Sequence, residues 1–285
     1  MKKLFVGILG LLLLSSCGRL DLIPYSPAQT PEDFLAAQPT IDLALGSMDI
    51  TLIQPTSTVL VYALGIVAIG VGAHFWRRRG LQKSRLWWAI ALALWGAGAL
   101  VVGTSYQALG YELKCAGRTL CTWTSWWEVV YLILSVASID AMMLAVAYAC
   151  TTDRWRKALT IYALVNAVLY TGTVLIGALI PVKFLVSFEL LIVVAAPSIF
   201  AFLIINGWRY AGRKDALDLA LLGTWIGLAL VLGLYFLYAV MGFTQTLWTR
   251  GLWFSDNDVL HIGLIIWIVY IDRVVAHRIT DLGGT

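Results

Sequence analysis

Seven long apolar segments constrain this chain more than any other feature of its sequence. Each is close to or longer than the ~20 residues that an α-helix needs to cross the hydrocarbon core of a membrane. The segments cover residues 58–76, 86–106, 126–150, 158–180, 183–206, 216–241 and 258–276. We therefore predict an all-α polytopic membrane protein, with a seven-helix transmembrane bundle over residues 58–276 and a cytoplasmic tail at 277–285.

The overall composition supports a membrane location. Hydrophobic residues make up 60% of the chain and charged residues 13%, and the mean hydropathy is +0.84. Soluble chains are about 45–50% apolar and about 25% charged. No segment combines low hydrophobicity with high charge, so we expect neither a disordered tail nor a nucleic-acid-binding arm. Membrane lipids are the expected partners, and the sequence identifies no protein partner.

The N-terminus is typical of a bacterial export signal. Two lysines precede an apolar stretch that is too short to cross a bilayer. The tetrapeptide Leu-Ser-Ser-Cys that ends at Cys17 also resembles a lipobox. We therefore expect residues 1–16 to be removed and Cys17 to carry lipid; the alternative is an ordinary signal that contains a cysteine by chance.

A proline-rich segment separates this signal from the first apolar segment. Five of the seven prolines fall between residues 18 and 57, which excludes a long helix there. We predict that residues 17–57 form a periplasmic tether, with a helical turn or two around residues 33–37.

The distribution of positive charge predicts the orientation of the bundle. Of the 20 lysines and arginines, 13 lie in alternate connections and near the C-terminus, five lie on the opposite side, and the other two are in the signal. Because cytoplasmic loops are enriched in Lys and Arg, the start of the bundle should be outside and its C-terminus inside. This orientation agrees with a lipidated Cys17 on the periplasmic face of the bacterial inner membrane.

The cysteines divide by predicted compartment. Cys115 and Cys121 share an outer loop, where an oxidising environment allows a disulfide to persist, and we expect these two cysteines to form one. A metal site there is a poor alternative, because the spacing is wrong and no histidine is near. We expect Cys150, at the cytoplasmic end of the third segment, to be a free thiol.

Polar residues within the apolar segments are functional candidates, because a charge in the membrane costs at least ~2.5 kcal/mol. The candidates near the predicted outer face are Gln107, Glu112, Glu128, Glu189, Asp256, Asn257, Asp258 and His261. Asp140 and Asn166 lie deeper, at similar depth on consecutive segments. We expect those two side chains to form a structural hydrogen-bonded clasp.

His261 is the most informative of these residues. Asn257 and Asp258 precede it by four and three positions, so the three side chains share one helical face. A carboxylate beside an imidazole can orient its tautomer, bind a metal with it, or act as a general base. The alternative is structural: Asp256 or Asn257 caps the helix, and His261 packs against a glutamate of a neighbouring helix.

Several activities of seven-helix proteins are excluded by missing residues. The last segment has no lysine between residues 259 and 276, so it lacks the anchor for a retinal Schiff base. His74 adjoins the arginine cluster at the end of the first segment and His277 lies in the tail, so His261 is the one histidine expected inside the membrane, and a haem held by two such histidines is excluded. No broken helix pair or internal repeat indicates a transporter.

Three short motifs resemble those of uncharacterised bacterial seven-helix membrane proteins. They are Gly-Thr-Ser-Tyr-Gln-Ala-Leu-Gly-Tyr-Glu at 103–112, Thr-Ser-Trp-Trp-Glu at 124–128 and Phe-Ser-Asp-Asn-Asp-Val-Leu-His at 254–261. Those proteins are in turn distantly similar to the CREST superfamily of membrane hydrolases, which includes alkaline ceramidases and adiponectin-receptor-like proteins. The resemblance spans residues 58–276 and implies a seven-helix bundle with its N-terminus outside.

The chemistry implied by the resemblance is a zinc ion held by three histidines, with a zinc-bound water that attacks a lipid amide or ester. Only His261 matches this pattern. Gln107 stands where the histidine of the second helix would be, and Asp256 or Asn257 stands where the first histidine of the seventh helix would be.

Carboxylates offer the other route to a metal site. Asp258 with Glu128 or Glu189 would give a site with a single histidine, a composition that favours harder divalent ions than zinc. A scaffold shared with the hydrolases is therefore better supported than a shared reaction.

Two functions follow. We favour a non-catalytic lipid-binding or sensing module with a degenerate hydrolase-like polar site. The alternative is a metal-dependent hydrolase of a lipid amide or ester, in which His261 is a ligand, Asp258 and Glu128 are co-ligands or base, and Glu189 supports them. In both cases we predict that one group of polar side chains converges near the outer face: Gln107, Glu128, Glu189, Asp258 and His261.

Overall fold

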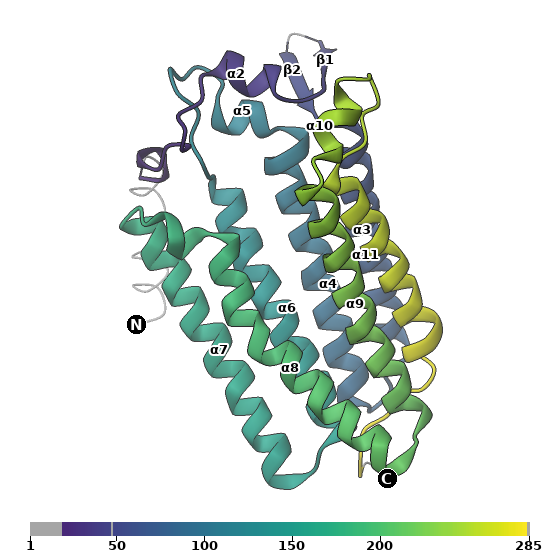
Figure 1. Cartoon of the computed structure of the whole chain (residues 1–285). Coiled ribbons are helices and arrows are strands. Elements are labelled where there is room, and N and C mark those ends of the chain that lie inside the picture. The colour runs from purple at the N-terminus through teal and green to yellow at the C-terminus, as the bar shows by residue number, and fades with distance from the viewer. Residues whose placement is uncertain (1–18, 47, 284–285) are drawn as a thin grey trace.

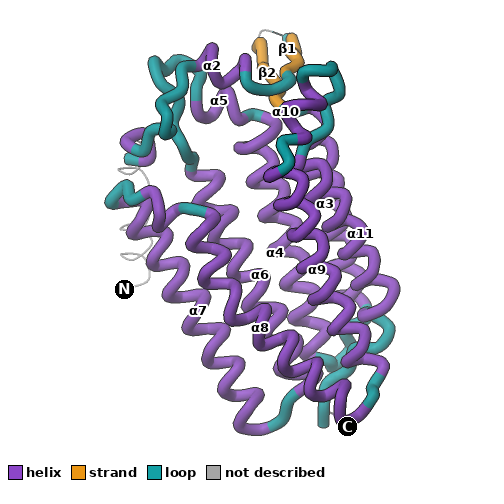
Figure 2. Tube along the Cα trace, viewed as in Figure 1, coloured by secondary structure: helices purple, strands orange, loops and turns teal. Residues whose placement is uncertain are grey.

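The computed structural model describes residues 19–46 and 48–283. Cys17 and the signal that precedes it lie outside the described residues, so export and lipidation stay predictions. The described chain is a bundle of long helices with a smaller cap at one end (Figure 1). Within it, the strands are confined to one hairpin in the cap (Figure 2).

The all-α architecture predicted from the apolar segments is confirmed. Six helices in the described ranges are long and apolar enough to cross a membrane: α3 (Pro55–Arg77), α4 with its extension η2 (Lys83–Ala108), α6 (Trp126–Cys150), α7 (Asp153–Leu179), α8 (Phe188–Arg213) and α9 (Ala216–Val240). The last predicted segment forms α11 (Asp256–Tyr270), continued by the π-helical turn η4 (Ile271–Val275). It packs against α3 and α9 as a further helix of the bundle.

The start of α8 follows local capping chemistry more than hydropathy. Ser187 accepts a hydrogen bond from the backbone N–H of Leu190 (3.3 Å) and begins α8 at Phe188, five residues after the start of the predicted apolar segment. The residues before this cap form a short 3-10 turn, η3 (Lys183–Val186). Serine caps also begin α6 and α11, since a serine oxygen satisfies an N–H that the first helical turn leaves free.

Helix α6 lies at the centre of the bundle and α7 at its edge. The most apolar part of α6 is 67% buried, whereas that of α7 is only 17% buried. α6 packs against α4, α7 and α8, while α3 packs against α4 and α11. At the end away from the cap, Trp225 of α9 stacks on Phe202 of α8 (4.2 Å between ring centroids) and on Trp88 of α4 (5.9 Å).

The cap is a folded unit that the sequence pattern does not predict. It contains η1 (Leu20–Leu22), α2 (Pro31–Ala36), β1 (Thr40–Leu45), β2 (Met48–Ile53) and α5 (Gly110–Lys114), and α10 (Phe243–Trp248) lies beside it (Figure 1). β1 and β2 pair antiparallel. A disulfide joins Cys115 to Cys121, and the backbone N–H of Cys121 donates to the carbonyl of Gln29 (2.9 Å). These contacts hold the proline-rich segment against the loop that follows α5.

At the opposite end, the C-terminal segment crosses the ends of α4 and α6. Asp281 accepts hydrogen bonds from the backbone N–H groups of Lys83 (2.8 Å) and Ser84 (2.7 Å) at the start of α4. The N–H of Leu282 donates to the carbonyl of Tyr148 on α6 (2.9 Å). The segment predicted as a cytoplasmic tail is therefore tied to the bundle through residue 282.

Candidate functional site

Glu128 is buried in the first turn of α6, where it pairs with a lysine from the cap. Its side chain is 2% exposed, and its Oε1 lies 3.0 Å from the ammonium nitrogen of Lys114 on α5. Ser105 of η2 donates a hydrogen bond to the same oxygen (2.8 Å). This ion pair joins the cap to the bundle. It also engages the carboxylate of Glu128, which the sequence had made a candidate base or metal ligand.

Lys114 is itself enclosed by aromatic rings. Its ammonium lies 4.9 Å from the ring centre of Tyr106 and 6.0 Å from those of Tyr25 and Phe34. Burial by itself lowers the pKa of Lys114, but attraction to the Glu128 carboxylate outweighs it, so the pKa of the amine lies above its usual value. Lys114 is thus charged at neutral pH.

Gln107 and Glu112 lie near this pair but have different surroundings. Gln107, in η2, is 4% exposed, and its Oε1 accepts no hydrogen bond from a described residue. Glu112 accepts a hydrogen bond from the backbone N–H of Thr51 (3.1 Å) and so helps to hold the hairpin against α5 within the cap.

Asp258 forms a second and separate polar cluster, at the start of α11. Its carboxylate is fully buried and accepts hydrogen bonds from the hydroxyl of Ser57 (2.9 Å) and from the backbone N–H of Ser255 (2.6 Å). The hydroxyl of Ser255 in turn caps the N–H of Asp258, which completes a capping box. The residue that caps this helix is therefore Ser255, and not Asp256 or Asn257 as the structural alternative supposed.

The remaining acidic and amide candidates lie at the surface or in loop contacts. Asp256 exchanges hydrogen bonds with Thr244 (3.0 Å), which ties α11 to α10. Asn257 donates a long hydrogen bond to Gln54 (3.5 Å). Glu189 is exposed in the first turn of α8.

His261 lies in the second turn of α11 without a polar partner. Its side chain is 6% exposed, and neither ring nitrogen makes a hydrogen bond to another residue of the described chain. The Nδ1 atom is completely buried. A buried nitrogen without a partner is uncommon because its desolvation is not compensated, so the surroundings of His261 are informative.

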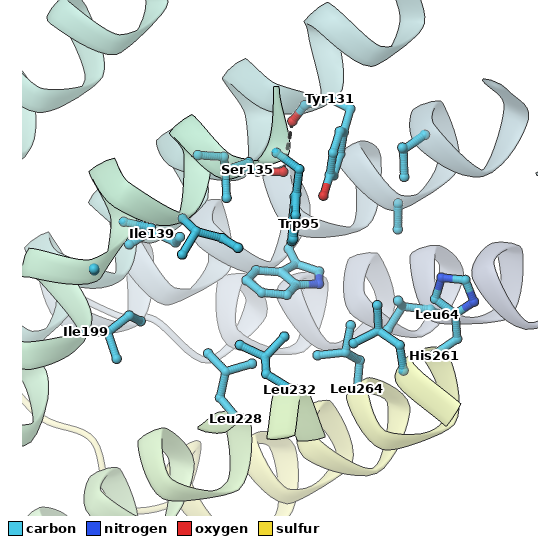
Figure 3. Close-up of a pocket in the computed structure, with 18 of the residues that line it drawn as sticks. Leu64, Trp95, Tyr131, Ser135, Ile139, Ile199, Leu228, Leu232, His261 and Leu264 are labelled. Atoms are coloured by element: carbon cyan, nitrogen blue, oxygen red, sulfur yellow. Dashed lines mark hydrogen bonds between the residues drawn. The ribbon is translucent and has the colours of Figure 1, made fainter. Parts of the chain in front are cut away.

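Those surroundings are one end of a cavity of about 340 Å³. Its walls come from α6 and α8 on one side and from α3, α4, α9 and α11 on the other (Figure 3). Almost all of the lining is apolar, and none of the residues that line it is Asp, Glu, Lys or Arg. The polar side-chain atoms in its walls belong to His261, Tyr131, Ser135 and Trp95.

The cavity forms where α8 and α9 diverge. The two helices meet near the stack of Phe202 on Trp225 and separate toward the cap (Figure 1). Two wall residues on α8, Ile192 and Phe200, are 42% and 64% exposed. The cavity therefore reaches the lateral surface of the bundle between these two helices.

The polar side chains expected to converge are divided among these places. In the described part of the chain, no hydrogen bond or ion pair joins any two of the five residues Gln107, Glu128, Glu189, Asp258 and His261. Across residues 19–46 and 48–283, no three His, Cys, Asp or Glu side chains lie together as a metal-binding group. A zinc site needs at least three such ligands, so the residues present do not fit the zinc centre that the resemblance implies.

The structure also contains a buried ionic cluster that the sequence reasoning missed. Asp218 of α9 is fully buried, and its Oδ1 accepts hydrogen bonds from Arg209 Nε (2.8 Å) and Asn206 Nδ2 (3.3 Å) of α8. The indole N–H of Trp225 donates to Asn206 (2.9 Å), and Cys150 is a buried free thiol beside them. The sequence did contain a signal for this cluster. Asp218 lies inside an apolar segment, and Arg209 precedes it on the other side of the short turn between α8 and α9.

The predicted clasp between Asp140 and Asn166 is present. The amide of Asn166 on α7 donates to both carboxylate oxygens of Asp140 on α6, at 3.0 and 3.2 Å. This pair joins the central helix of the bundle to the helix at its edge, as expected from the similar depth of the two residues.

Fold and site together define a polytopic helical membrane protein with paired buried charges and an apolar cavity beside a lone histidine. Residues 56–280 match the model of a family described as "Family of unknown function (DUF6962)", and the chain belongs to this family. The matched region begins with α3 and ends after η4, so it contains the whole cavity. No curated protein and no solved structure matches the chain.

Proposed function

We propose that this chain is a membrane-embedded module that binds the apolar chain of a lipid in the cavity between α8 and α9. The cavity carries the proposal. Its volume of about 340 Å³ falls within the range of about 300–1,000 Å³ typical of ligand sites. Its walls are apolar, and the exposed side chains of Ile192 and Phe200 place an entrance where a lipid chain would approach from the bilayer.

The proposed setting is a bundle with seven membrane crossings. The 15 residues of α11 and the 5 of η4 together rise about 30 Å, which matches the thickness of the hydrocarbon core. With the positive charge placed inside, the cap lies on the periplasmic side of the bacterial inner membrane and the C-terminus in the cytoplasm. Lipidation of Cys17 would then attach the N-terminus to the outer leaflet.

This orientation is tested by labelling with a membrane-impermeant maleimide on intact spheroplasts. A cysteine at Thr249, in the exposed loop after α10, should react from outside. A cysteine at Lys214, between α8 and α9, should react only after lysis. The reverse pattern would overturn the orientation, and reaction of both sites from outside would overturn the count of seven crossings.

We favour binding over catalysis because the candidate catalytic groups are already occupied. Glu128 is paired with Lys114, and Asp258 accepts two short hydrogen bonds in a capping box. A general base must be free to take a proton within hydrogen-bond reach of its substrate. Neither carboxylate is among the residues that line the cavity, and of the candidate catalytic residues only His261 lines it.

The binding proposal is tested with an alkyl diazirine, a photoreactive hydrocarbon, added to the full chain in lipid nanodiscs. Illumination should attach the probe to peptides of α6, α8 and α9 that line the cavity. The Ala195→Phe substitution fills the cavity from α8, and Leu232→Trp fills it from α9. Both should reduce this labelling strongly.

The control is Val193→Phe, which adds a ring on the same helix at a side chain that is 62% exposed. It should leave the cavity labelling unchanged, and thermal unfolding in detergent confirms that all three variants are folded. Labelling confined to the outer faces of the helices, or unaffected by the two filling variants, would overturn the proposal.

A further inference from the structure

The cavity is lined by a buried histidine whose hydrogen-bonding capacity is unused. His261 lines the cavity, is only 6% exposed, and has no polar partner among the described residues. A neutral imidazole carries one N–H donor and one nitrogen acceptor. In an apolar enclosure each is left unsatisfied unless a partner supplies the complementary atom, and because Nδ1 is completely buried, Nε2 is the ring nitrogen that a ligand can reach.

The position of His261 gives the cavity two different ends. In Figure 3 the imidazole lies at one end and Ile199 at the other, with Trp95 and Tyr131 between them. His261 is near the start of α11, on the side of the cap, whereas Ile199 is about halfway along α8. A ligand with one polar end and one apolar chain matches this polarity.

The length of the cavity suits a single chain. Its wall on α8 runs from Phe188 to Phe200. At 1.5 Å per residue this stretch rises about 18 Å, close to the ~15 Å depth of the hydrocarbon in one leaflet.

The same lining excludes a charged head group. No acidic or basic side chain faces the cavity, so a phosphate or a quaternary ammonium inside it would lose its hydration without gaining a counter-ion. A hydroxyl or carbonyl oxygen loses much less hydration, and one hydrogen bond satisfies it. The walls also contain the Tyr131 hydroxyl and the Trp95 indole N–H, which are uncharged hydrogen-bonding groups.

We propose that the ligand is a single-chain lipid with an uncharged, oxygen-bearing head group, hydrogen-bonded to His261, whose apolar chain extends along α8 toward Ile199. This inference rests on the proposed function, because it names the class of lipid that the cavity takes. The head group lies on the side of the cap and the chain points toward the middle of the membrane.

The test is competition against the diazirine label in nanodiscs, with four probes of equal chain length. Hexadecane has no head group, cetyl alcohol has a hydroxyl, methyl palmitate has a carbonyl without a donor, and cetyltrimethylammonium is charged. For wild type, we expect cetyl alcohol to compete about fivefold better than hexadecane, as one hydrogen bond typically provides. Partitioning into the nanodisc cancels when this ratio is compared between variants.

His261→Phe keeps a flat ring but removes both nitrogens, so the ratio should fall about fivefold from its wild-type value while hexadecane still competes. His261→Gln, which retains a donor and an acceptor, should restore part of the preference. His277→Phe is the matched control, since it removes an exposed histidine outside the cavity and should leave the ratio unchanged.

The outcomes separate the two proposals. If hexadecane and cetyl alcohol compete equally in wild type, or if His261→Phe leaves the ratio unchanged, the role of His261 is overturned and chain binding stands. Equal competition by cetyltrimethylammonium would likewise overturn the uncharged head group. If no probe displaces the label, chain binding itself fails. Competition by methyl palmitate as well as by the alcohol would show that the histidine N–H donates to a carbonyl.

Discussion

Replacing Lys114 with methionine should leave the Glu128 carboxylate buried without its counter-ion. Methionine preserves the length and apolar volume of the lysine stem, so the change isolates the charge. The two side chains are 3% and 2% exposed, and among the described residues Glu128 would keep its hydrogen bond from Ser105. Because the pair joins α5 to α6, its loss should loosen the cap as well as destabilise the fold.

The expected cost follows from the burial of the pair. Removing one partner of a buried ion pair typically costs about 3–5 kcal/mol, since the other charge stays desolvated. An exposed pair contributes at most ~1 kcal/mol, because water already solvates both charges. The cap offers such a pair in Arg118 and Asp21, which lie 3.0 Å apart with side chains that are 35% and 38% exposed. Arg118→Met is therefore the matched control.

The assay is the free energy of unfolding in mixed detergent micelles, together with hydrogen exchange of the segment from α5 to the disulfide. Lys114→Met should lose several times more stability than Arg118→Met. Adding Glu128→Gln to Lys114→Met removes both charges, so the double variant should be more stable than the single one. Equal losses of unfolding free energy for Lys114→Met and Arg118→Met would refute a stabilising role for the buried ion pair between Lys114 and Glu128.

The pH dependence has a definite sign. Because the folded pKa of Lys114 lies above its ordinary value of 10.5, the stabilisation from its charge is fully present below pH 10.5. It is lost as the pH rises through the folded pKa. The difference in stability between wild type and Lys114→Met should therefore be constant near neutral pH and shrink only in strong alkali.

Three further outcomes are expected. A Cβ at Gly96 would lie 2.6 Å from a backbone carbonyl oxygen of α3, so Gly96→Ala should cost about 1–3 kcal/mol of stability in a detergent unfolding assay. Gly70→Ala, where nothing lies within 4 Å, should cost less than this, and equal losses would contradict close packing of α3 on α4. Asn166→Leu breaks the clasp with Asp140 and should cost about 0.6–1.7 kcal/mol in the same assay; no loss would show that the bond contributes nothing. Elemental analysis of the purified protein should find no stoichiometric zinc, iron or manganese, whereas a metal lost on His261→Ala would restore the hydrolase alternative.

The helical architecture was predictable because a membrane permits few backbone conformations. Within lipid every backbone N–H and C=O must be bonded inside the chain, so each long apolar segment has to be a helix. The third segment was predicted at 126–150, and α6 is Trp126–Cys150. Helix α8 is shifted most, since it ends at Arg213 instead of 206 and begins at Phe188 instead of 183. Its later start arises because Ser187 caps the helix inside a segment that hydropathy alone treats as continuous.

Hydrogen-bonded pairs of polar residues at equal membrane depth could also be predicted from the sequence. Asp140 and Asn166 lie on consecutive segments, and adjacent helices place residues of equal depth side by side. Lys114 was not found, because it lies in a loop where a lysine is ordinarily exposed. Only the folding of α2 and α5 over the end of the bundle encloses it with Tyr25 and Phe34.

By itself, then, the sequence determined which long segments are helices, where they begin and end to within seven residues, and which polar residues lie at a common depth. It did not determine which way each helix faces, because helices that are apolar all round have no strong polar face to set their rotation. That rotation is decided by side-chain packing between helices. Packing separated Glu128 from Asp258, left Glu189 exposed, and placed His261 at the end of a cavity that forms only because α8 and α9 diverge.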